Sequence, residues 1–597
     1  MAAFTTRPEI LGTFGVVAST HWLATASGMA ILEKGGNAFD AACATGFALQ
    51  VVEPHMCGLG GDVPMILATA GGERAEVICG QGPAPEAATL EAYRALGIDL
   101  IPGNGLLAAV VPGAFDAWLL LLERFGTMTL ADVLAAAIGY ARDGHPIHPN
   151  VVDVIAGVRP LFEDEWPTSA AVYLPGGQPP CPESLFRNPV LAETYQRLVD
   201  AEAAAHGSRE AGIAAARGAF YEGFVAEAID RYCRENEVMD ASGERHRGFL
   251  TADDMARWRA TIEAPVTYDY HGTTVCKTGP WGQGPVFLQQ LALLKGFDLS
   301  GMSADDPDFV HTVVECAKLA YADREAYYGD PDFVDVPLET LLSDDYNDAR
   351  RALIGEEASL ALVPGAVPGF EPRIVQPAPP EETAGALGVG EPTIAGPNRP
   401  AGPAAGDTVH FDIVDRHGNF ISATPSGGWL QSSPVIPELG FCLPTRAQMF
   451  WIEDGLPSSL AAGKRPRTTL TPSLALRDGK PYMAFGTPGG DQQDQWSLHF
   501  LLRHLHFGLN LQEAIDAPSF HSEHFPSSFY PRQASPGRLV MEGRFSSPTL
   551  AELERRGHLI ELADDWSEGR MTAAVKDGDI LKAAANARQM QNYAIGR

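Results

Sequence analysis

Thr408 combines a residue type and a position that could support nucleophilic catalysis. It follows Gly406-Asp407 and begins a stretch in which apolar and polar residues alternate as in a half-buried strand. If the chain is cut before Thr408, this residue carries both a hydroxyl nucleophile and a free α-amine. The ordinary pKa of such an amine is about 7.7, so at neutral pH a useful fraction can act as base for the hydroxyl. Because Thr also begins many strands without a catalytic role, this stretch alone leaves both interpretations open.

Acyl transfer also needs hydrogen-bond donors for a negatively charged oxygen. Gly489 and Gly490 lie between a predicted strand, 482–485, and a predicted helix that runs from about 492 to 507. Backbone N–H groups at the start of a helix lack intrahelical partners and favour negative charge. We therefore expect these two amides to form an oxyanion hole, in which each donor is worth roughly 10²–10³ in rate.

A Ser-His-Asp type of triad is the first alternative. Thr408, His410 and Asp412 share one face of the predicted strand. Side chains two residues apart on a strand stand about 7 Å from each other, which is too far for direct relay bonds. The sequence also lacks a G-x-S-x-G elbow, so we do not expect a triad.

Metal and phosphate chemistry find little support. Among the 16 His there is no H-E-x-x-H motif, and His499, His504 and His506 fall in one predicted helix without a carboxylate at ligand spacing. The glycine-rich run 57–62 lacks the residues of a Walker or dinucleotide motif, and we expect it to pack its backbone closely beside a site. The sequence therefore predicts neither a metal ion nor a cofactor.

The elements around these residues alternate between strands and helices. Strands are predicted at 63–68 and 74–78, followed by a mostly helical region from about 90 to 262 and by strands within 261–277. The Pro- and Gly-rich segment 364–406 is expected to be a mobile connection, suited to a break in the chain. More strands follow at 420–424, 473–476 and 482–485, with an Asp-Gly hairpin turn at 478–479. Strands on both sides of the connection are expected to join one layered core.

Composition limits the class of protein. A net charge of −32 over 597 residues opposes binding to nucleic acid or to anionic membranes and suits an enzyme acting on small molecules. The eight Cys are scattered without C-x-x-C pairs, which favours reduced thiols. No secretory signal and no apolar run of membrane-spanning length is visible, so a cytoplasmic location is expected.

Several further stretches carry a family resemblance and follow one another along nearly the whole chain. They are 34–42, 58–61, 317–324, 329–331, 407–410, 463–469, 488–490 and 511–518. In these motifs the sequence resembles the γ-glutamyltransferase (γ-glutamyltranspeptidase) family. The resemblance implies an α+β fold, the four-layer αββα sandwich of Ntn hydrolases. It also implies self-cleavage between Asp407 and Thr408 into a large chain (1–407) and a small chain (408–597) that stay associated, with Thr408 as nucleophile and Gly489 and Gly490 as oxyanion hole.

Departures from the family pattern fall in the substrate pocket. In γ-glutamyl enzymes of the family that this sequence resembles, an Arg holds the α-carboxylate of the substrate. Gln81 stands at the corresponding position here. Met449 stands where an acidic residue grips the α-amino group, and Arg446 appears nearby. A pocket that lacks both anchors should bind γ-glutamyl compounds poorly, whereas Arg446 could clamp a carboxylate elsewhere on a substrate. Arg446 could equally be a structural residue.

Smaller departures lie closer to the nucleophile. Ser426 and Gly428 replace a Thr and an Asn, and Thr468 and Thr469 replace a pair of Ser residues. With Trp429, which could wall the pocket or belong to the core, these changes resemble the acylase and amidohydrolase branch of the family, including cephalosporin-acylase-like enzymes and oxamate amidohydrolase.

These observations favour a self-processing amidohydrolase that forms an acyl ester on Thr408 and releases it with water. One alternative is a true γ-glutamyl hydrolase or transferase with a rearranged pocket. The other is an unprocessed, non-catalytic relative that acts as a binding protein. The sequence leaves the oligomeric state of the processed pair open.

Overall fold

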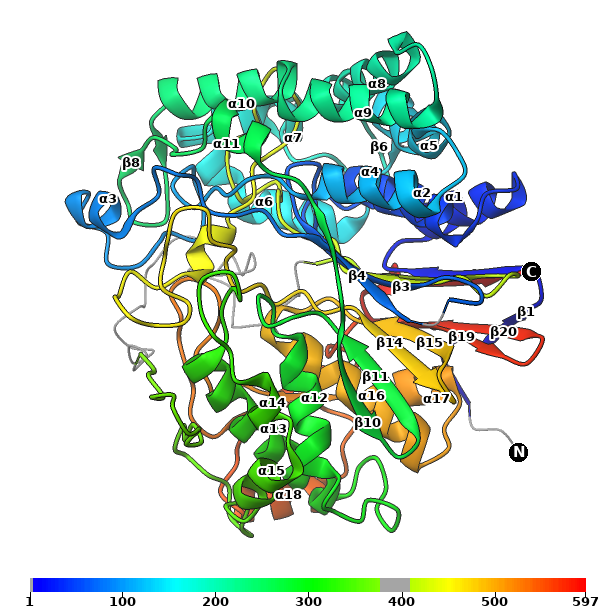
Figure 1. Cartoon of the computed structure of the whole chain (residues 1–597), viewed down its shortest axis with the longest axis vertical. Coiled ribbons are helices and arrows are strands. Elements are labelled where there is room, and N and C mark those ends of the chain that lie inside the picture. Colours follow the sequence, from blue (N-terminus) through cyan, green and yellow to red (C-terminus); the bar gives the residue numbers. More distant parts are fainter. Residues whose placement is uncertain (1–3, 73, 376–407) are drawn as a thin grey trace.

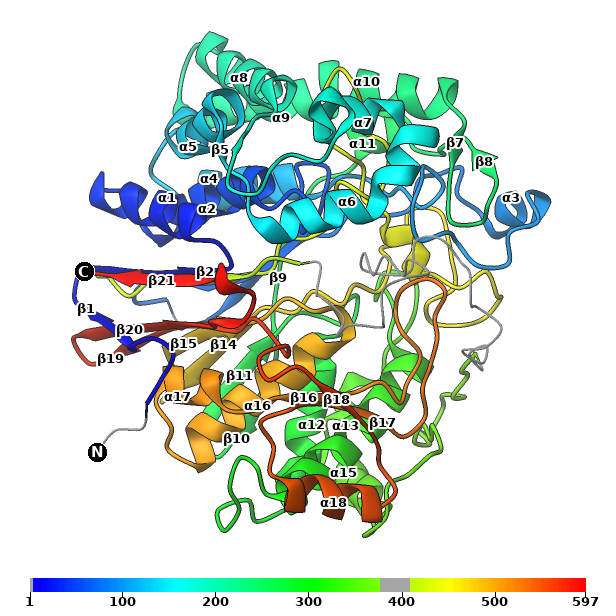
Figure 2. The ribbon, with the colours of Figure 1, turned by 180° about the vertical axis from the view of Figure 1, so that it is seen from behind.

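Two stacked β-sheets form the centre of the molecule, and a layer of helices covers the outer face of each (Figure 1). The computed structural model describes residues 4–72, 74–375 and 408–597. Within these residues each of the two main sheets has seven strands. The predicted α+β, four-layer αββα architecture is confirmed, as both views show (Figure 2).

The first main sheet, sheet B, contains the strand that follows Thr408. Its order is β21 (Tyr593–Gly596), β2 (Gly15–Ser19), β12 (Phe411–Asp415), β13 (Phe420–Ala423), β3 (Val63–Ala68), β4 (Glu76–Gly80) and β9 (Thr261–Glu263). All of its pairings are antiparallel. Strand β12 thus lies between one strand that precedes the predicted cut and one that follows it.

The second main sheet, sheet A, carries the turn with the glycine pair. Its order is β1 (Ile10–Gly12), β20 (Ile580–Ala585), β19 (Thr572–Asp577), β15 (Lys480–Gly486), β14 (Ser473–Arg477), β11 (Thr273–Lys277) and β10 (Val266–Tyr270). The turn between β14 and β15 has φ of 49° at Asp478 and 72° at Gly479, the left-handed pair that an Asp-Gly hairpin requires. The predicted hairpin is confirmed.

Helices cover sheet B on one side and sheet A on the other (Figure 1). Those on the side of sheet B are α1 (Trp22–Glu33), α2 (Ala38–Val52), α4 (Ala114–Phe125), α5 (Leu130–Asp143), α6 (Pro149–Asp164), α7 (Pro167–Tyr173), α8 (Pro189–Ala204), α9 (Arg209–Tyr221), α10 (Phe224–Glu235) and α11 (Ala252–Arg257). Those on the side of sheet A are α12 (Gly284–Leu294), α13 (Pro307–Tyr327), α14 (Leu338–Leu341), α15 (Asp344–Arg351), α16 (Gln493–His506), α17 (Leu511–Asp516) and α18 (Ser547–Arg555).

Smaller elements complete the chain. They are α3 (Leu90–Ala95), the pairs β5 (His145–Pro146) with β6 (Leu185–Phe186) and β7 (Val238–Met239) with β8 (Arg245–His246), and the sheet of β16 (Phe520–Ser522), β17 (Arg538–Glu542) and β18 (Leu559–Ala563). Strands β17 and β18 are parallel, whereas β16 and β17 are antiparallel.

Hydrophobic residues fill three interfaces between the four layers. One cluster joins sheet B to its helices and another joins sheet A to its helices. The cluster between the two sheets is rich in alanine, including Ala18, Ala68, Ala484, Ala574 and Ala583. Because these side chains are small, they allow the two sheets to approach closely.

Strand β12 corrects two details of the prediction. It begins at Phe411, not at Thr408, and every residue of β12 is buried, so the strand is not half-exposed. The reason lies in the layers: one face of β12 contacts α2 and the other contacts β19 and β15 of sheet A. Strand β4 likewise begins at Glu76, later than predicted.

The Pro- and Gly-rich segment predicted to be mobile falls largely outside the described residues, as does Asp407. Its first part, 364–375, is described and contacts the folded core. Val367 is buried, the amide of Gly365 donates to Asp323 at 2.7 Å, and Arg373 donates to the carbonyl of Gly455 at 3.1 Å. Mobility of 376–406 and cleavage after Asp407 stay predictions.

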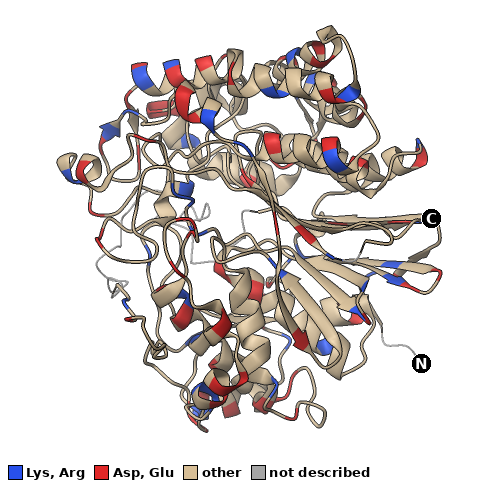
Figure 3. Ribbon diagram, in the orientation of Figure 1, with Lys and Arg blue, Asp and Glu red and all other residues tan. Residues whose placement is uncertain are grey.

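Charged side chains are most frequent on the outer helices and loops (Figure 3). The two sheets carry some as well, such as Lys576 and Asp577 on β19 and Lys582 on β20. In the described part of the chain, no helix is both long and apolar enough to cross a membrane.

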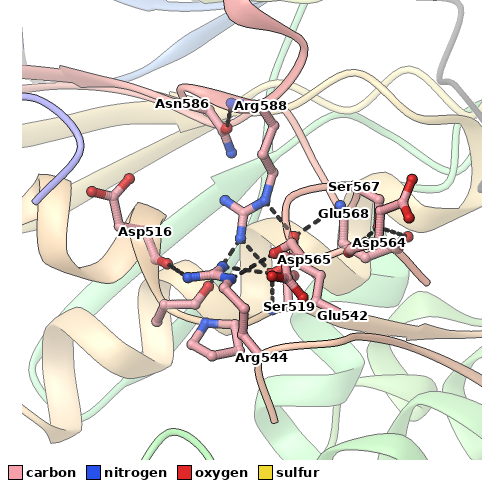
Figure 4. Close-up of polar contacts among 12 residues, drawn as sticks. Asp516, Ser519, Glu542, Arg544, Asp564, Asp565, Ser567, Glu568, Asn586 and Arg588 are labelled. Atoms are coloured by element: carbon pink, nitrogen blue, oxygen red, sulfur yellow. Dashed lines mark hydrogen bonds and ion pairs between the residues drawn. The ribbon is translucent and has the colours of Figure 1, made fainter. Parts of the chain in front are cut away.

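A buried ion-pair network anchors the C-terminal segment that leads toward the site. Glu542 on β17 binds Arg588 and also Arg544, whose Nη2 lies 2.6 Å from Oε2 (Figure 4). Burial alone would raise the pKa of Glu542, but Arg588 and Arg544 lower it below its usual value. The network fixes the segment after β20, which carries Gln591 and Asn592.

Candidate active site

Thr408 is fully buried and lies just before β12, where it forms a single β-bridge with Ser426. Its Oγ1 lies 3.1 Å from the Ser426 hydroxyl. The amide of the next residue, Val409, donates to the carbonyl of Pro425 at 3.0 Å. The backbone around the predicted nucleophile is therefore fixed by the loop after β13.

Arg570 links Thr408 to the turn with the glycine pair. Its Nη2 donates to the Thr408 carbonyl at 2.7 Å, and its backbone amide donates to Thr487 Oγ1 at 2.9 Å. Thr487 precedes Pro488 and Gly489 in the chain. One residue thus holds the predicted nucleophile of one sheet beside the predicted oxyanion turn of the other.

The glycine pair adopts a backbone that favours glycine. Gly489 has φ of 125° and Gly490 has φ of 50°, and a Cβ on Gly489 would lie 2.2 Å from the Trp496 ring. A short 3₁₀ turn, Gly490–Gln492, follows and leads into α16. Neither glycine amide donates to an acceptor among the described residues, so both can bind an oxygen of a ligand.

Asp491 stabilises this turn through its carboxylate. Its carboxylate pairs with buried Arg324 of α13 and accepts from the amide of Ser528 at 2.8 Å. Burial opposes ionisation, yet Arg324 and Ser528 hold the pKa of Asp491 below its usual value. Gln283 connects the same parts, because it accepts from Arg324 at 2.8 Å and donates to the Gly490 carbonyl at 3.3 Å.

His410 and Asp412 are closer than the spacing along a strand predicts. His410 Nε2 lies 3.2 Å from both carboxylate oxygens of Asp412, and Nδ1 lies 2.8 Å from Thr424 Oγ1. The imidazole extends along the strand and so shortens the separation that Cβ positions suggest. Asp412 also accepts from Thr572 of β19 at 2.6 Å, so the group joins the two sheets. The contact of the Thr408 hydroxyl that the structure describes is with Ser426, not His410.

The glycine-rich run 57–62 packs as predicted. A Cβ on Gly58 would lie 2.3 Å from the Gly428 carbonyl, and one on Gly61 would lie 2.1 Å from the Ser426 carbonyl. Gly428 itself has φ of 66°. The predicted close backbone packing beside the site is confirmed, and it brings Asp62 into hydrogen bonds with the backbone of Ser426.

Arg446 is a buried cation whose two terminal nitrogens, Nη1 and Nη2, are available to bind a ligand. Its Nε lies 3.1 Å from both carboxylate oxygens of Asp62, and its guanidinium lies 5.1 Å from the centre of the Trp429 ring. Nη1 and Nη2 are buried and have no hydrogen-bond partner among the described residues. Burial raises the pKa of Asp62, although Arg446 opposes this shift. Two unpartnered donors on one cation match the two oxygens of a carboxylate in number and geometry.

Gln81 lies beside this pair. It follows β4, and continuing the register from Val63↔Gly80 places it opposite Asp62. Its amide nitrogen and oxygen are both buried without a partner in the described residues. Gln81 is therefore placed opposite Asp62, the residue that contacts Arg446 and the backbone of Ser426.

The other predicted pocket residues lie in two different places. Met449 packs with Trp429 and Phe529 in a small apolar cluster, next to the guanidinium of Arg446. Thr468 lies next to Gln283, whose amide donates to the Thr468 carbonyl at 2.9 Å. Thr469 is buried, and its hydroxyl has no partner among the described residues.

Four residues at the site were not predicted from the sequence: Asp62, Arg570, Glu53 and Phe529. No local pattern marks them, because each contacts the site from a segment distant in the sequence. His499, His504 and His506 were considered as metal ligands and rejected. Among the described residues, the ligand atoms of His311, Glu315 and His558 lie within 4.8 Å of one another. There Glu315 already pairs with Lys318 at 2.6 Å, and His311 lies 2.9 Å from His558.

Comparison with known proteins places the chain in a family. The sequence profile described as Gamma-glutamyltranspeptidase matches residues 24–596. The chain belongs to the gamma-glutamyltranspeptidase family. It is therefore an enzyme of the Ntn-hydrolase class, as predicted.

Relatives within the gamma-glutamyltranspeptidase family include hydrolases of other amides. The oxamate amidohydrolase proenzyme of Klebsiella pneumoniae is 31% identical over 598 residues, covering 98% of this chain and 99% of the relative. The structure titled "Structure of LmbA2991HD" is 55% identical, with a TM-score of 0.93 and full coverage of both chains. The cephalosporin acylase from Bacillus halodurans is 27% identical, with a TM-score of 0.82 over 100% of this chain and 98% of its own.

Proposed function

We propose that this gamma-glutamyltranspeptidase-family enzyme is a self-processing amidohydrolase that uses Thr408 as its N-terminal nucleophile. Its substrate is a small amide with a carboxylate on the acyl side, and water is favoured over an amine as the second substrate. The observation that carries the proposal is the unfilled fork of Arg446, which is linked through Asp62 and Ser426 to the Thr408 hydroxyl.

The chemistry follows from the groups at the site. After the Asp407–Thr408 bond is cut, the α-amine of Thr408 takes the hydroxyl proton while Oγ1 attacks the substrate carbonyl. The amides of Gly489 and Gly490 stabilise the resulting oxyanion. The amine then passes its proton to the leaving nitrogen, which leaves an acyl ester on Thr408. Water attacks this ester with the same amine as base, and the acid and the Thr408 hydroxyl are regenerated.

Substrate selection rests on three groups around the acyl carbon. The two free Nη donors of Arg446 match the two oxygens of a carboxylate. The unpartnered amide of Gln81 offers one donor and one acceptor, and Met449 offers an apolar surface with no charge for an ammonium group. An oxamate-like amide, with its carboxylate beside the scissile carbonyl, fits this set better than a γ-glutamyl group does.

Self-processing and the nucleophile are tested with one variant. Wild-type protein should give two bands on denaturing electrophoresis, with Thr408 as the N-terminal residue of the smaller one. Thr408→Ala should stay full length and inactive. A wild-type chain that stays intact on long incubation would exclude self-processing and favour the non-catalytic alternative. Activity in Thr408→Ala would remove Thr408 as nucleophile.

Substrate class is tested by comparing turnover of oxamate, a simple acyl amide without carboxylate and a γ-glutamyl anilide. We expect kcat/KM to be highest for oxamate or a related carboxylate-bearing amide. Fast turnover of the anilide would instead support the alternative, a true γ-glutamyl hydrolase or transferase with a rearranged pocket.

The setting of the enzyme is part of the proposal. We place it in the cytoplasm, in line with eight cysteines that are all free thiols, seven of them buried. The large and small chains of one precursor form the working unit.

A further inference from the structure

Arg570 is the charged residue that lies against Thr408 itself. Its Nη2 donates to the carbonyl of Thr408 at 2.7 Å, and an α-amine lies within about 3.5 Å of the carbonyl oxygen of its own residue. The guanidinium nitrogen therefore sits no more than roughly 6 Å from the position of the future Thr408 amine. The backbone of Arg570 is fixed as well, since its amide is bound to Thr487 and its carbonyl accepts from Asn592 at 3.1 Å.

We propose that Arg570 is a positioning residue that holds the Thr408 carbonyl and, after the cut, keeps more of the new α-amine unprotonated at neutral pH by repelling its protonated form. The inference rests on the proposed function of Thr408 as an N-terminal nucleophile. It assigns to Arg570 a role that depends on its charge and not only on its hydrogen bond. A cation at about 6 Å in a protein interior of effective dielectric near 20 shifts a titration by roughly one to two pH units.

Glu53 is a carboxylate that lies next to Arg570 and can offset its charge. Its Oε1 lies 3.7 Å from Arg570 Nη1, and its other oxygen accepts from Thr20 at 2.6 Å. Burial raises the pKa of Glu53 to about 7, although Arg570 opposes the shift. Below this pH Glu53 is largely neutral and offsets little of the Arg570 charge; above it the carboxylate offsets part of that charge.

Three other groups of the described residues near Thr408 are either paired or neutral. Arg446 is paired with Asp62, and Asp412 lies against His410. Burial lowers the pKa of His55, which lies in the loop after α2 near Arg570, well below its usual value, so its imidazole is neutral. Among these described groups, Arg570 is the cation that contacts Thr408 directly.

The proposal predicts different responses of the pH profile to changes at the two residues. The acid limb of kcat/KM reports protonation of the essential base in the free enzyme. Arg570→Met should move this limb to higher pH by about one unit, which is an approximately tenfold loss of kcat/KM below the limb. Glu53→Gln should leave this limb nearly in place, because Glu53 is already largely neutral below about pH 7. Arg570→Lys keeps the cation and should retain the wild-type limb, with a lower kcat because the hydrogen bond is altered.

The assay uses the fully processed fraction of each variant, with Arg416→Met, an exposed arginine outside the site, as the matched control. If Arg570→Met does not process, Arg570→Lys carries the test. An acid limb that is unchanged in Arg570→Met, or that moves to higher pH in Arg570→Lys, would overturn the inference. Failure of the proposed function is distinguishable, because it would appear as activity in Thr408→Ala whatever the pH profile.

Discussion

At the scale of single residues, the open question is what the guanidinium of Arg446 binds. Because Nε is occupied by Asp62 while both Nη atoms are free, Arg446→Lys is a sharper test than Arg446→Ala. The lysine keeps a charge for buried Asp62 but loses the planar fork. We expect KM for a carboxylate-bearing amide to rise roughly 10- to 100-fold, with kcat nearly unchanged, since a hydrogen bond to a charged group contributes about 1.5–3 kcal/mol.

The matched control for Arg446→Lys is the same amide without its carboxylate, whose KM should not change. A KM that rises equally for both substrates would mean that Arg446 shapes the pocket and does not bind the carboxylate.

Residues of the site differ in how far the sequence could predict them. Thr408 and the glycine pair could be found because the strand start, the helix start and the family motifs mark them locally. The departure at Arg446 was visible, but its unfilled fork was not, because that depends on Asp62 arriving from the glycine-rich run. Arg570 and Glu53 carried no signal, since their link to Thr408 joins segments from opposite ends of the chain.

At the scale of elements, the brace between α13 and the turn before α16 should support catalysis. Arg324 and Asp491 form a buried ion pair directly below the glycine amides. Asp491→Asn preserves the shape of the side chain but removes the negative charge that pairs with Arg324. Breaking a buried ion pair in this way lowers the free energy of unfolding by about 3–5 kcal/mol. We expect kcat to fall about 100-fold in steady-state assays, with a small change in KM, because the oxyanion donors lose their alignment.

The surface pair of Asp308 and Arg556 provides the control for this prediction. Asp308 lies in the first turn of the same helix α13 and is exposed, so Asp308→Asn should leave kcat unchanged. A wild-type kcat in Asp491→Asn would show that the turn keeps its geometry without the brace.

Strand β16 carries a buried histidine that should make stability depend on pH. Burial alone would lower the pKa of His521, but Glu568, 2.5 Å from Nδ1, and Glu523 raise it to about 9. The usual value is about 6.5, so the contribution is fully present below pH 6.5 and is lost as pH rises through about 9. It amounts to roughly 3 kcal/mol.

Thermal unfolding between pH 6 and pH 10 measures this contribution. Wild-type protein should lose more Tm over this range than His521→Gln, while His417→Gln, at an exposed histidine, should follow the wild type. Parallel curves for wild type and His521→Gln would show that His521 is neutral in the folded protein.

At the scale of the whole molecule, the layers followed from the family resemblance and many strand positions from residue patterns. The order of strands within each sheet did not, because it depends on pairings across hundreds of residues, such as β2 with β12. The burial of β12 on both faces was missed for the same reason: alternation of residue types cannot show that a second sheet covers the polar face.

The strand order predicts what happens to the two chains after cleavage before Thr408. Sheet B combines β2, β3, β4 and β9 from the first chain with β12, β13 and β21 from the second, and sheet A is mixed in the same way. Separation would therefore break backbone hydrogen bonds in both sheets and expose the core between them. Processed protein should elute as one peak from a native sizing column yet give two bands under denaturing conditions, and it should separate only in denaturant. Two native peaks, each with one chain, would contradict the interleaved sheets, because neither chain contains a complete sheet without the other.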